Sequence, residues 1–191
     1  YQYHQPLSQY WGTGTLSSSD GQRFPVPVNS RNATAIVWYF GVGRGVTFYT
    51  WTSDQYSQYG TKVISSTARD ATYVLDGILD NETELCILEH TTDTSGYTEL
   101  VFALFDLLNM RFSPRIRDIG EQRLYRIDEK IKYNNVETVL KGKINCKIII
   151  DNWDNLVKVA GSLKFGCVTA SLLINKLQSY TSQNELTKTL R

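Results

Sequence analysis

Apolar and polar residues in the first part of the chain follow patterns typical of strands. Residues 13–24 favour an extended backbone, with the turn-forming pair Asp20 and Gly21 at their centre. Residues 33–40 and 46–52 are rich in β-branched and aromatic side chains. Because glycines at positions 41, 43 and 45 separate these two runs, the pattern predicts two or three antiparallel strands joined by tight turns.

The apolar period becomes helical after residue 62. Five residues of this stretch recur at spacings of three and four positions: Ile64, Ala68, Ala71, Leu75 and Ile78. This period predicts a helix over residues 62–79. The short apolar run at 85–88 lies between acidic residues and is typical of a buried strand.

The rest of the chain is predicted to be mostly helical. Thr98 is a candidate N-cap for a buried helix over residues 100–110, which Pro114 prevents from continuing. Residues 124–127 favour a short strand, and helices follow from about residue 135. One apolar face of these helices is formed by Trp153, Leu156, Val157, Ala160 and Leu163.

The order of these elements is strands, helix, strand, helix, strand and helices, which is a mixed α/β pattern. One architecture that fits is the ribonuclease H-like fold. It is a mixed sheet with an antiparallel three-strand start followed by parallel strands, and helices flank it. The pattern by itself does not select this fold over other α/β folds.

Size and composition describe one domain. The chain has 191 residues, 41% of them hydrophobic, which is enough for a single core. No run approaches the roughly 18 apolar residues of a membrane helix, and the N-terminus lacks a signal-peptide pattern. The sequence begins without Met and ends at Arg191 within a helical pattern, so we expect a fragment of a longer protein.

The three cysteines, Cys86, Cys146 and Cys167, are far apart and lie in apolar surroundings. An odd number without paired spacing argues against a disulfide framework or a zinc site. The prediction is three buried thiols in a reducing compartment.

Charge is unevenly distributed along the chain. Residues 1–100 hold five Lys and Arg against ten Asp and Glu, a net charge of −5, whereas residues 101–191 hold fifteen against nine, a net charge of +6. The two halves sum to the net charge of +1. This asymmetry fits a cation-binding site near a surface that contacts phosphates.

Two aspartates are the candidate catalytic residues. Asp20 lies on an early strand, and Asp93 follows the predicted buried strand and precedes a helix. If the two strands are neighbours, the carboxylates converge and offer the oxygen ligands that Mg²⁺ prefers. Two such ions can promote in-line attack on a phosphodiester. Spacing alone favours the simpler interpretation, a turn residue and a helix cap, because a chain of this length contains many Asp pairs.

Long sequence blocks around these residues resemble the DDE transposases of replicative, cointegrate-forming transposons, the Tn-three family. The resemblance covers nearly the whole chain, in the order expected of the family. The blocks are SSSDGQRF at 17–24, GRGVTFYT at 43–50, SDQYSQYGTKVI at 53–64, RDATYVLDGIL at 69–79, HTTDTSGYTELVFALFDLL at 90–108, RFSPRIRD at 111–118 and NWDNLVKVAGSLKFGCVTASLL at 152–173. Residues 128–147 match poorly.

The resemblance implies a ribonuclease H-like domain with an Asp-Asp-Glu triad that binds Mg²⁺, for which Mn²⁺ would substitute. Asp20 matches the first aspartate and Asp93 the second. The glutamate is expected past Arg191, so residues 1–191 would be a partial catalytic domain, truncated before the third acidic residue. Such enzymes release a 3′-hydroxyl at each transposon end and transfer it into target DNA. DNA is the implied partner, the full-length protein is expected to be a homo-oligomer, and the bacterial cytoplasm is the expected location.

Several other residues are candidates for DNA contact. Arg23 and Arg44 flank glycines, and Arg111, Arg115 and Arg117 begin a basic run that continues to Arg123 and Arg126. Phosphate contacts and ordinary solvated surface are equally good interpretations of these arginines. Trp38, Tyr39, Tyr49 and Trp51 could stack on flipped bases, although a place in the sheet's core is favoured. For His90 a structural role is favoured over a phosphate contact.

Two alternative functions remain open at this stage. A related enzyme on a similar sheet would be a ribonuclease H-like nuclease that cleaves RNA. The absence of a third carboxylate in the matching motif also fits a catalytically incomplete DNA-binding fragment.

Overall fold

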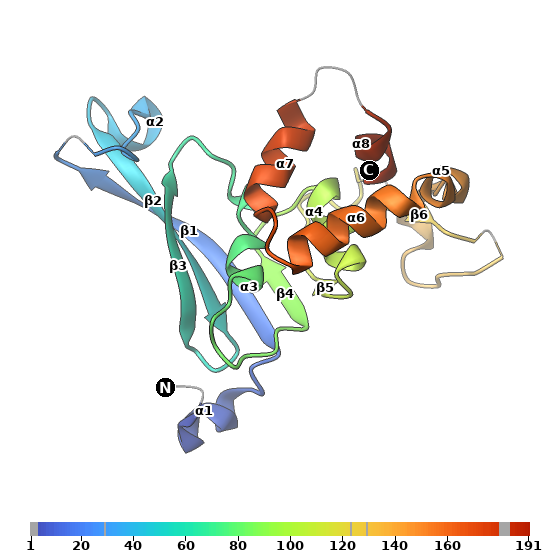
Figure 1. Ribbon diagram of the computed structural model, residues 1–191, viewed down its shortest axis with the longest axis horizontal. Helices are drawn as coiled ribbons and strands as arrows, with labels where there is room; N and C mark the ends of the chain where they lie inside the picture. Colours follow the sequence, from blue (N-terminus) through green and yellow to red (C-terminus); the bar gives the residue numbers. More distant parts are fainter. Residues whose placement is uncertain (1–3, 29, 123, 129, 180–183) are drawn as a thin grey trace.

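The computed structural model describes residues 4–28, 30–122, 124–128, 130–179 and 184–191. Its main sheet and the helices around it form a mixed α/β arrangement (Figure 1). The strands are β1 (Leu16–Val26), β2 (Arg44–Ser53), β3 (Gln58–Ser65), β4 (Glu89–Thr92), β5 (Arg111–Phe112), β6 (Leu124–Arg126) and β7 (Leu140–Lys143). The α-helices are α1 (Pro6–Trp11), α2 (Val37–Phe40), α3 (Asp76–Leu79), α4 (Glu99–Leu107), α5 (Cys146–Asp151), α6 (Trp153–Lys164), α7 (Ala170–Ser179) and α8 (Glu185–Thr189). Short 3₁₀ turns are η2 (Asp70–Thr72) and η3 (Glu137–Val139).

The main sheet has five strands in the order β3-β2-β1-β4-β5. Strands β1, β2 and β3 pair antiparallel, whereas β4 pairs parallel to β1 and β5 parallel to β4. The antiparallel three-strand start followed by parallel strands is therefore confirmed. A separate two-stranded sheet joins β6 to β7.

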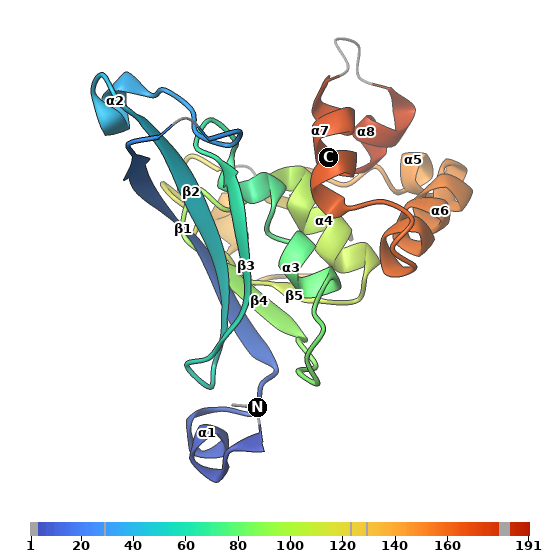
Figure 2. The same ribbon diagram turned by 60° about the vertical axis from the view of Figure 1, so that its left-hand side comes forward.

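Helices α3, α4, α6 and α7 lie on one side of the main sheet (Figure 2). The core forms between this layer and the inward face of the sheet, which contributes Tyr49, Trp51 and Ile64. Helix α4 packs buried side chains into this core, among them Leu104 and Phe105. The Thr98 side chain accepts a hydrogen bond from Val101 N at 3.3 Å, which confirms the predicted N-cap of α4.

Two expected elements are wrong in type. Residues 62–79 do not form one helix but end β3 and then form η2 and α3. Residues 33–40 do not form a strand: after one isolated bridge, Thr34 to Gly45, they form the short exposed helix α2. The pair Asp20–Gly21 lies within β1 rather than in a turn, because β1 continues alongside β2 as far as Val26.

Other expectations are displaced along the chain. The run at 85–88 precedes β4 instead of forming it, because the ladder with β1 begins at Leu16 and Glu89. The predicted strand at 124–127 is confirmed as β6, but its partner β7 lies where helices were expected. In α6 the buried residues are Leu156, Val159 and Leu163, so that Trp153 and Val157 are wrongly assigned to the core face.

The cysteines are also corrected. Cys86, Cys146 and Cys167 are free and exposed, not buried. Cys86 points outward because burial alternates along the extended segment around it, with Leu85 and Ile87 inward. Among the described residues no helix is long and apolar enough to cross a membrane.

A buried carboxylate joins the sheet to the helical layer. Asp76 on α3 is only 2% exposed and lies 2.6 Å from Lys62 Nζ of β3. Its Oδ1 accepts a hydrogen bond from Ser171 N at 2.8 Å, and its Oδ2 accepts one from Ser171 Oγ at 2.6 Å. Since Ser171 belongs to α7, 95 residues away in sequence, this cluster fixes three elements against one another.

We predict that Asp76→Ala lowers the free energy of unfolding by about 3–5 kcal/mol, because it leaves the Lys62 ammonium and the Ser171 donors without their buried partner. Urea denaturation would measure the change. Asp80→Ala, at the exposed end of the same helix, is the matched control and should change stability by less than about 0.5 kcal/mol. Equal effects of the two substitutions would contradict a structural role for the cluster.

Candidate active site between strands β1 and β4

Parallel pairing of β1 and β4 places the two candidate aspartates side by side. The ladder ends with the pair Ser19 and Thr92. The next residue on each chain segment is Asp20 on β1 and Asp93 immediately after β4, and both are exposed. The convergence expected from the sequence therefore follows from the register of neighbouring strands.

Local hydrogen bonds orient one oxygen of each carboxylate. Asp20 Oδ1 accepts from Gly21 N at 2.7 Å, and Asp93 Oδ1 accepts from Ser95 N at 3.0 Å and from Ser95 Oγ at 2.7 Å. The loop after Asp93 folds back so closely that a side chain at Gly96 would collide with Thr92, which explains the glycine. Within the described parts of the chain, neither Oδ2 accepts a hydrogen bond, so that one oxygen of each aspartate remains open to a ligand.

His90 on β4 ties the two strands together from their buried face. Its Nδ1 lies 2.6 Å from Ser17 Oγ and its Nε2 lies 2.8 Å from Ser19 Oγ, while Ser19 Oγ lies 2.8 Å from the Tyr49 hydroxyl. The ring stacks on Phe105 at a centroid distance of 5.9 Å. Burial lowers the pKa of His90 to about 3, so the imidazole is neutral and one ring nitrogen donates while the other accepts. The favoured structural role of His90 agrees with this geometry.

Asp70, in η2, lies beneath the candidate aspartates on the inward side of β1. A side chain at Gly21 would bring its Cβ within 3.2 Å of Asp70 Oδ1, and Asp70 Oδ2 lies 3.3 Å from Ser95 Oγ, which shares its single proton with the closer Asp93. The side chain is buried, and its Oδ1 has no hydrogen-bond partner in the described ranges of the chain. Burial raises the pKa of Asp70, the Arg23 guanidinium and the Ser95 hydrogen bond lower it, and the charges of Asp93 and Asp20 raise it.

Sequence reasoning missed Asp70 because residues 62–79 were expected to form one continuous helix. That prediction used only the apolar positions of the segment. The one available signal was the block at 69–79, which contains Asp70 and matches the transposase family.

The five candidate arginines occupy different surroundings. Arg115 is held beside Asp93 through its backbone, because its N–H donates a hydrogen bond to the carbonyl of the preceding residue, Thr92, at 2.8 Å. Arg111 lies at the start of β5 and pairs with Glu89 at 3.2 Å. Arg117 is exposed in the following turn. Arg23 and Arg44 belong to the β1–β2 ribbon, with the Arg23 guanidinium carbon 4.4 Å from the centroid of Tyr39. Arg126 pairs with Glu137 at 2.6 Å, and Arg123 lies outside the described residues.

The four candidate aromatic residues divide into two pairs. Tyr49 and Trp51 are each 1% exposed and pack edge to face at 4.9 Å, with Trp51 Nε1 donating to Val74 O. Burial raises the pKa of Tyr49, as do the nearby charges of Asp70, Asp20 and Asp93. The core prediction is confirmed for this pair. It is wrong for Trp38 and Tyr39, which are 91% and 54% exposed on α2.

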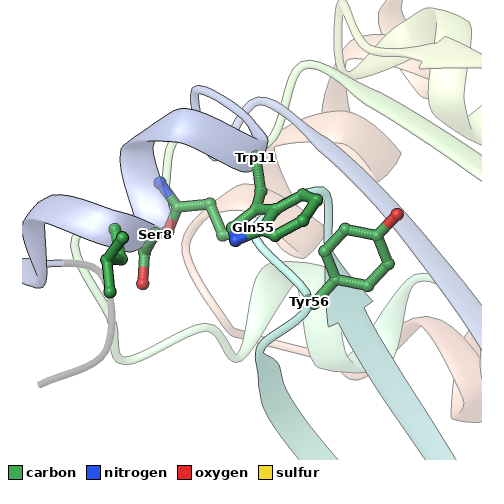
Figure 3. Close-up of a pocket in the computed structure, with 5 residues that line it drawn as sticks. Ser8, Trp11, Gln55 and Tyr56 are labelled. Carbon is green, nitrogen blue, oxygen red and sulfur yellow. The ribbon is translucent and has the colours of Figure 1, made fainter.

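A shallow cavity of about 580 Å³ lies at the other end of β1, between α1 and the β2–β3 turn (Figure 3). Leu7, Ser8, Trp11, Gln55 and Tyr56 line it. None of these residues belongs to the segments that carry Asp20 or Asp93, so this cavity is separate from the candidate active site.

The chain matches the family model described as the Tn3 transposase DDE domain over residues 1–191. It belongs to that family. The resemblance drawn from the sequence blocks is thereby confirmed. The match spans both aspartate segments and the helical layer that supports them.

Relatives of known name agree with this assignment. The chain is 48% identical over 185 residues to the transposase for transposon Tn1546 of Enterococcus faecium, which covers 97% of this chain and 19% of that protein. It is 44% identical over 191 residues to the transposase for Tn501 of Pseudomonas aeruginosa, covering 100% of this chain and 19% of the relative. The chain thus spans about a fifth of the length of these curated relatives.

We predict that the His90 network weakens in acid. The folded-state pKa of about 3 lies below the value of about 6.5 for an unfolded histidine, so the unfolded chain binds the proton first. Stability from this group is complete above about pH 6.5 and falls as pH drops toward 3, by about 2 kcal/mol between about pH 7 and about pH 5. Urea denaturation of the protein and of His90→Gln at both pH values would isolate this contribution.

The stability advantage of the unmodified protein over His90→Gln should shrink in acid by that amount. His4→Gln changes the second histidine, which is exposed, and should leave the pH dependence intact. An advantage of His90 that stays constant with pH would show that the imidazole is not buried in its neutral form.

Proposed function

We propose that this chain is the catalytic domain, or most of it, of a transposase that cleaves DNA at transposon ends and joins the 3′-hydroxyls to target DNA. The observation that carries the proposal is the placement of Asp20 and Asp93 next to each other, one residue past the last β1–β4 pair. The strand order and pairing directions support a ribonuclease H-like fold for the domain. Family membership supports the reaction class.

The donor set fits a divalent metal ion. Both side chains are exposed carboxylates, and each keeps Oδ2 open while Oδ1 is held by backbone N–H groups. Mg²⁺ is usually held by one or two carboxylates together with waters and substrate phosphate, so a pair of aspartates is a sufficient protein contribution. In the part of the chain that the structure describes, no three His, Cys, Asp or Glu side chains are grouped to hold a metal. We assign the proposed site to Asp20 and Asp93, with Mn²⁺ as a substitute for Mg²⁺.

The residues of this chain would act by positioning and by charge. Metal ions bound here would favour deprotonation of the attacking hydroxyl or water and stabilise the leaving oxygen of a phosphodiester. Asp20 and Asp93 fix where the scissile phosphate lies, and Ser95 fixes the orientation of Asp93. Arg115, which is held next to Asp93 through Thr92, is placed to contact a neighbouring phosphate.

The remaining assignments follow from the family. We expect the third carboxylate to be a glutamate outside residues 1–191. Arg23, Arg44, Arg111 and Arg117 stay candidate DNA contacts. The exposure of Arg44, Arg111 and Arg117 supports this role. A homo-oligomeric transposase acting on DNA in the bacterial cytoplasm is the biological setting that we propose.

We predict that Asp20→Asn and Asp93→Asn each weaken Mn²⁺ binding by residues 1–191 by at least about tenfold, the loss that removal of a supporting residue alone can cause. Electron paramagnetic resonance of free Mn²⁺ would measure the affinity. Asp106→Asn, an exposed aspartate on α4, removes the same charge elsewhere and should have no effect. Equal affinities in all three variants would contradict the metal assignment.

Two further measurements separate the alternative functions. Cleavage of an RNA·DNA hybrid that Asp93→Asn abolishes would favour a ribonuclease H-like nuclease. Salt-dependent DNA binding that persists in the double variant, with no DNA cleavage or joining by a longer protein that contains this chain, would favour a binding fragment.

A further inference from the structure

The strands β1 and β2 extend past the end of β4, with β3 paired to β2 as far as Val46, and α2 lies at the far end of this β1–β2 ribbon (Figures 1 and 2). We call residues 37–42, which form α2 and the turn after it, the aromatic tip. The two views agree that the aromatic tip lies away from the helical layer that covers the sheet. The ribbon therefore presents the aromatic tip to the solvent.

The side chains of the aromatic tip are unusually exposed for their size. Trp38 is 91% exposed, Val37 79% and Tyr39 54%. A short helix made only of apolar and aromatic residues normally buries them, but α2, with the sequence VWYF, buries none. An exposed group of this kind indicates a surface that binds something.

The backbone beneath these side chains is held in place. Thr34 and Gly45 exchange two hydrogen bonds of 3.0 Å, which close the base of the loop. The Phe40 ring packs on Gly45, where any side chain would collide with it. Because the loop is closed and anchored, Trp38 is presented from a defined position.

The segment that carries the aromatic tip holds charges of a single sign. Residues 21–53 contain Arg23, Arg31 and Arg44 but no Asp or Glu. Arg23 lies over the face of Tyr39, and Arg31 is exposed. Aromatic faces among arginines, without carboxylates, are the combination that binds unpaired nucleotides, because bases stack on the rings and phosphates pair with the guanidinium groups.

The aromatic tip also lies at a useful distance from the candidate active site. Val26, the last residue of β1, lies six positions beyond Asp20, and Arg23, which contacts Tyr39 of the aromatic tip, lies three positions beyond it. At about 3.3 Å per residue the distance from Asp20 to Val26 is about 20 Å, which equals about six base-pair steps of a duplex. A DNA segment that is bound at the two aspartates and lies along the ribbon would also contact the aromatic tip.

We propose that the aromatic tip is a DNA-stacking site, in which Trp38 stacks on an unpaired base within about six nucleotides of the phosphate held at Asp20 and Asp93. The proposal rests on the proposed function and adds a second contact to it. Arg31 and Arg44 bind the phosphates on either side of that base. The Arg23–Tyr39 stack forms the floor against which the base is held.

Trp38→Ala should weaken binding of a forked DNA by residues 1–191 by about tenfold, the usual size of one lost stacking contact. The probe is a duplex that ends in six unpaired nucleotides, with 2-aminopurine as the unpaired base nearest the fork. Fluorescence anisotropy gives the affinity, and quenching of 2-aminopurine reports stacking directly. Trp38→Phe should restore most of both signals, because it keeps an aromatic face.

Trp153→Ala is the matched control, since Trp153 is a 54% exposed tryptophan on α6. It should leave affinity and quenching unchanged. Arg31→Gln should reduce the slope of log affinity against log salt by about 0.7, one single-strand phosphate contact. Thermal unfolding would check that each variant folds. Because these side chains are exposed, their substitution should change stability little.

Three outcomes would overturn the DNA-stacking site. The first is salt-dependent DNA binding with no change in quenching or affinity for Trp38→Ala, which rejects the site and leaves the proposed function intact. The second is a dimer of residues 1–191 in analytical ultracentrifugation that Trp38→Ala dissociates, which makes the tip an interface between copies. The third is the absence of any DNA binding together with intact Mn²⁺ binding, which rejects the site on this domain. Equal Mn²⁺ affinities of Asp93→Asn and Asp106→Asn would instead reject the proposed function.

Discussion

The candidate active site depends on the pairing of a four-residue strand, β4, with the first four residues of β1. So few ladder positions give little backbone hydrogen bonding, and the pairing is reinforced by the neutral imidazole of His90, which lies between the hydroxyls of Ser17 and Ser19. Alternation along β1 then decides where the neighbouring side chains go. Ser17 and Ser19 face the buried histidine, whereas Asp20 faces outward at the end of the ladder. The geometry of the aspartates is thus fixed by a group on the opposite face of the sheet that has no access to solvent.

Asp70 and Asp76 are buried carboxylates six residues apart in sequence, and their hydrogen-bonding surroundings differ. Asp76 receives an ammonium group and two Ser171 donors, so its charge is satisfied and the helical layer is held to the sheet. Asp70 receives the 3.3 Å contact from Ser95, and its Oδ1 has no hydrogen-bond partner among the described residues. Two other buried polar atoms in the same situation, Arg23 Nε and Thr92 Oγ1, belong to β1 and β4, and three more lie away from the candidate site on Gln55, Tyr59 and Thr187. Asp76 is thus satisfied within the fold, whereas Asp70 keeps an oxygen that is not.

The sequence predicted elements whose determinants are local and misplaced those that depend on distant partners. β1, β2 and α4 were foreseen because strand-forming side chains, a capping threonine and a following proline act within a few residues. The helix expected over 62–79 rested on apolar positions that do reach the core, among them Ile64, Ala71 and Leu75. Each of these three reaches it from a different element, since a strand, a 3₁₀ turn and a loop before a helix can bury the same positions as one helix. The convergence of Asp20 and Asp93 needed only the correct neighbour for β1, whereas Asp70 needed the actual path of the chain between β3 and β4.

Charge counted over half of the chain also conceals how it is arranged in space. Residues 1–100 carry a net charge of −5, yet their only acid before Asp54 is Asp20, and three arginines lie between the two. Beyond Asp20, the rest of β1, the connection to β2 and β2 itself (residues 21–53) carry three arginines and no carboxylate, so this part of the β1–β2 ribbon is positive. A polyanion would be repelled by two uncompensated aspartates and attracted to the ribbon. Cations bound at the site would remove that repulsion, so both the cations and the positive ribbon would favour binding of a polyanion. Because Asp20 and the ribbon belong to one continuous strand, DNA that binds both, as proposed, would lie along β1.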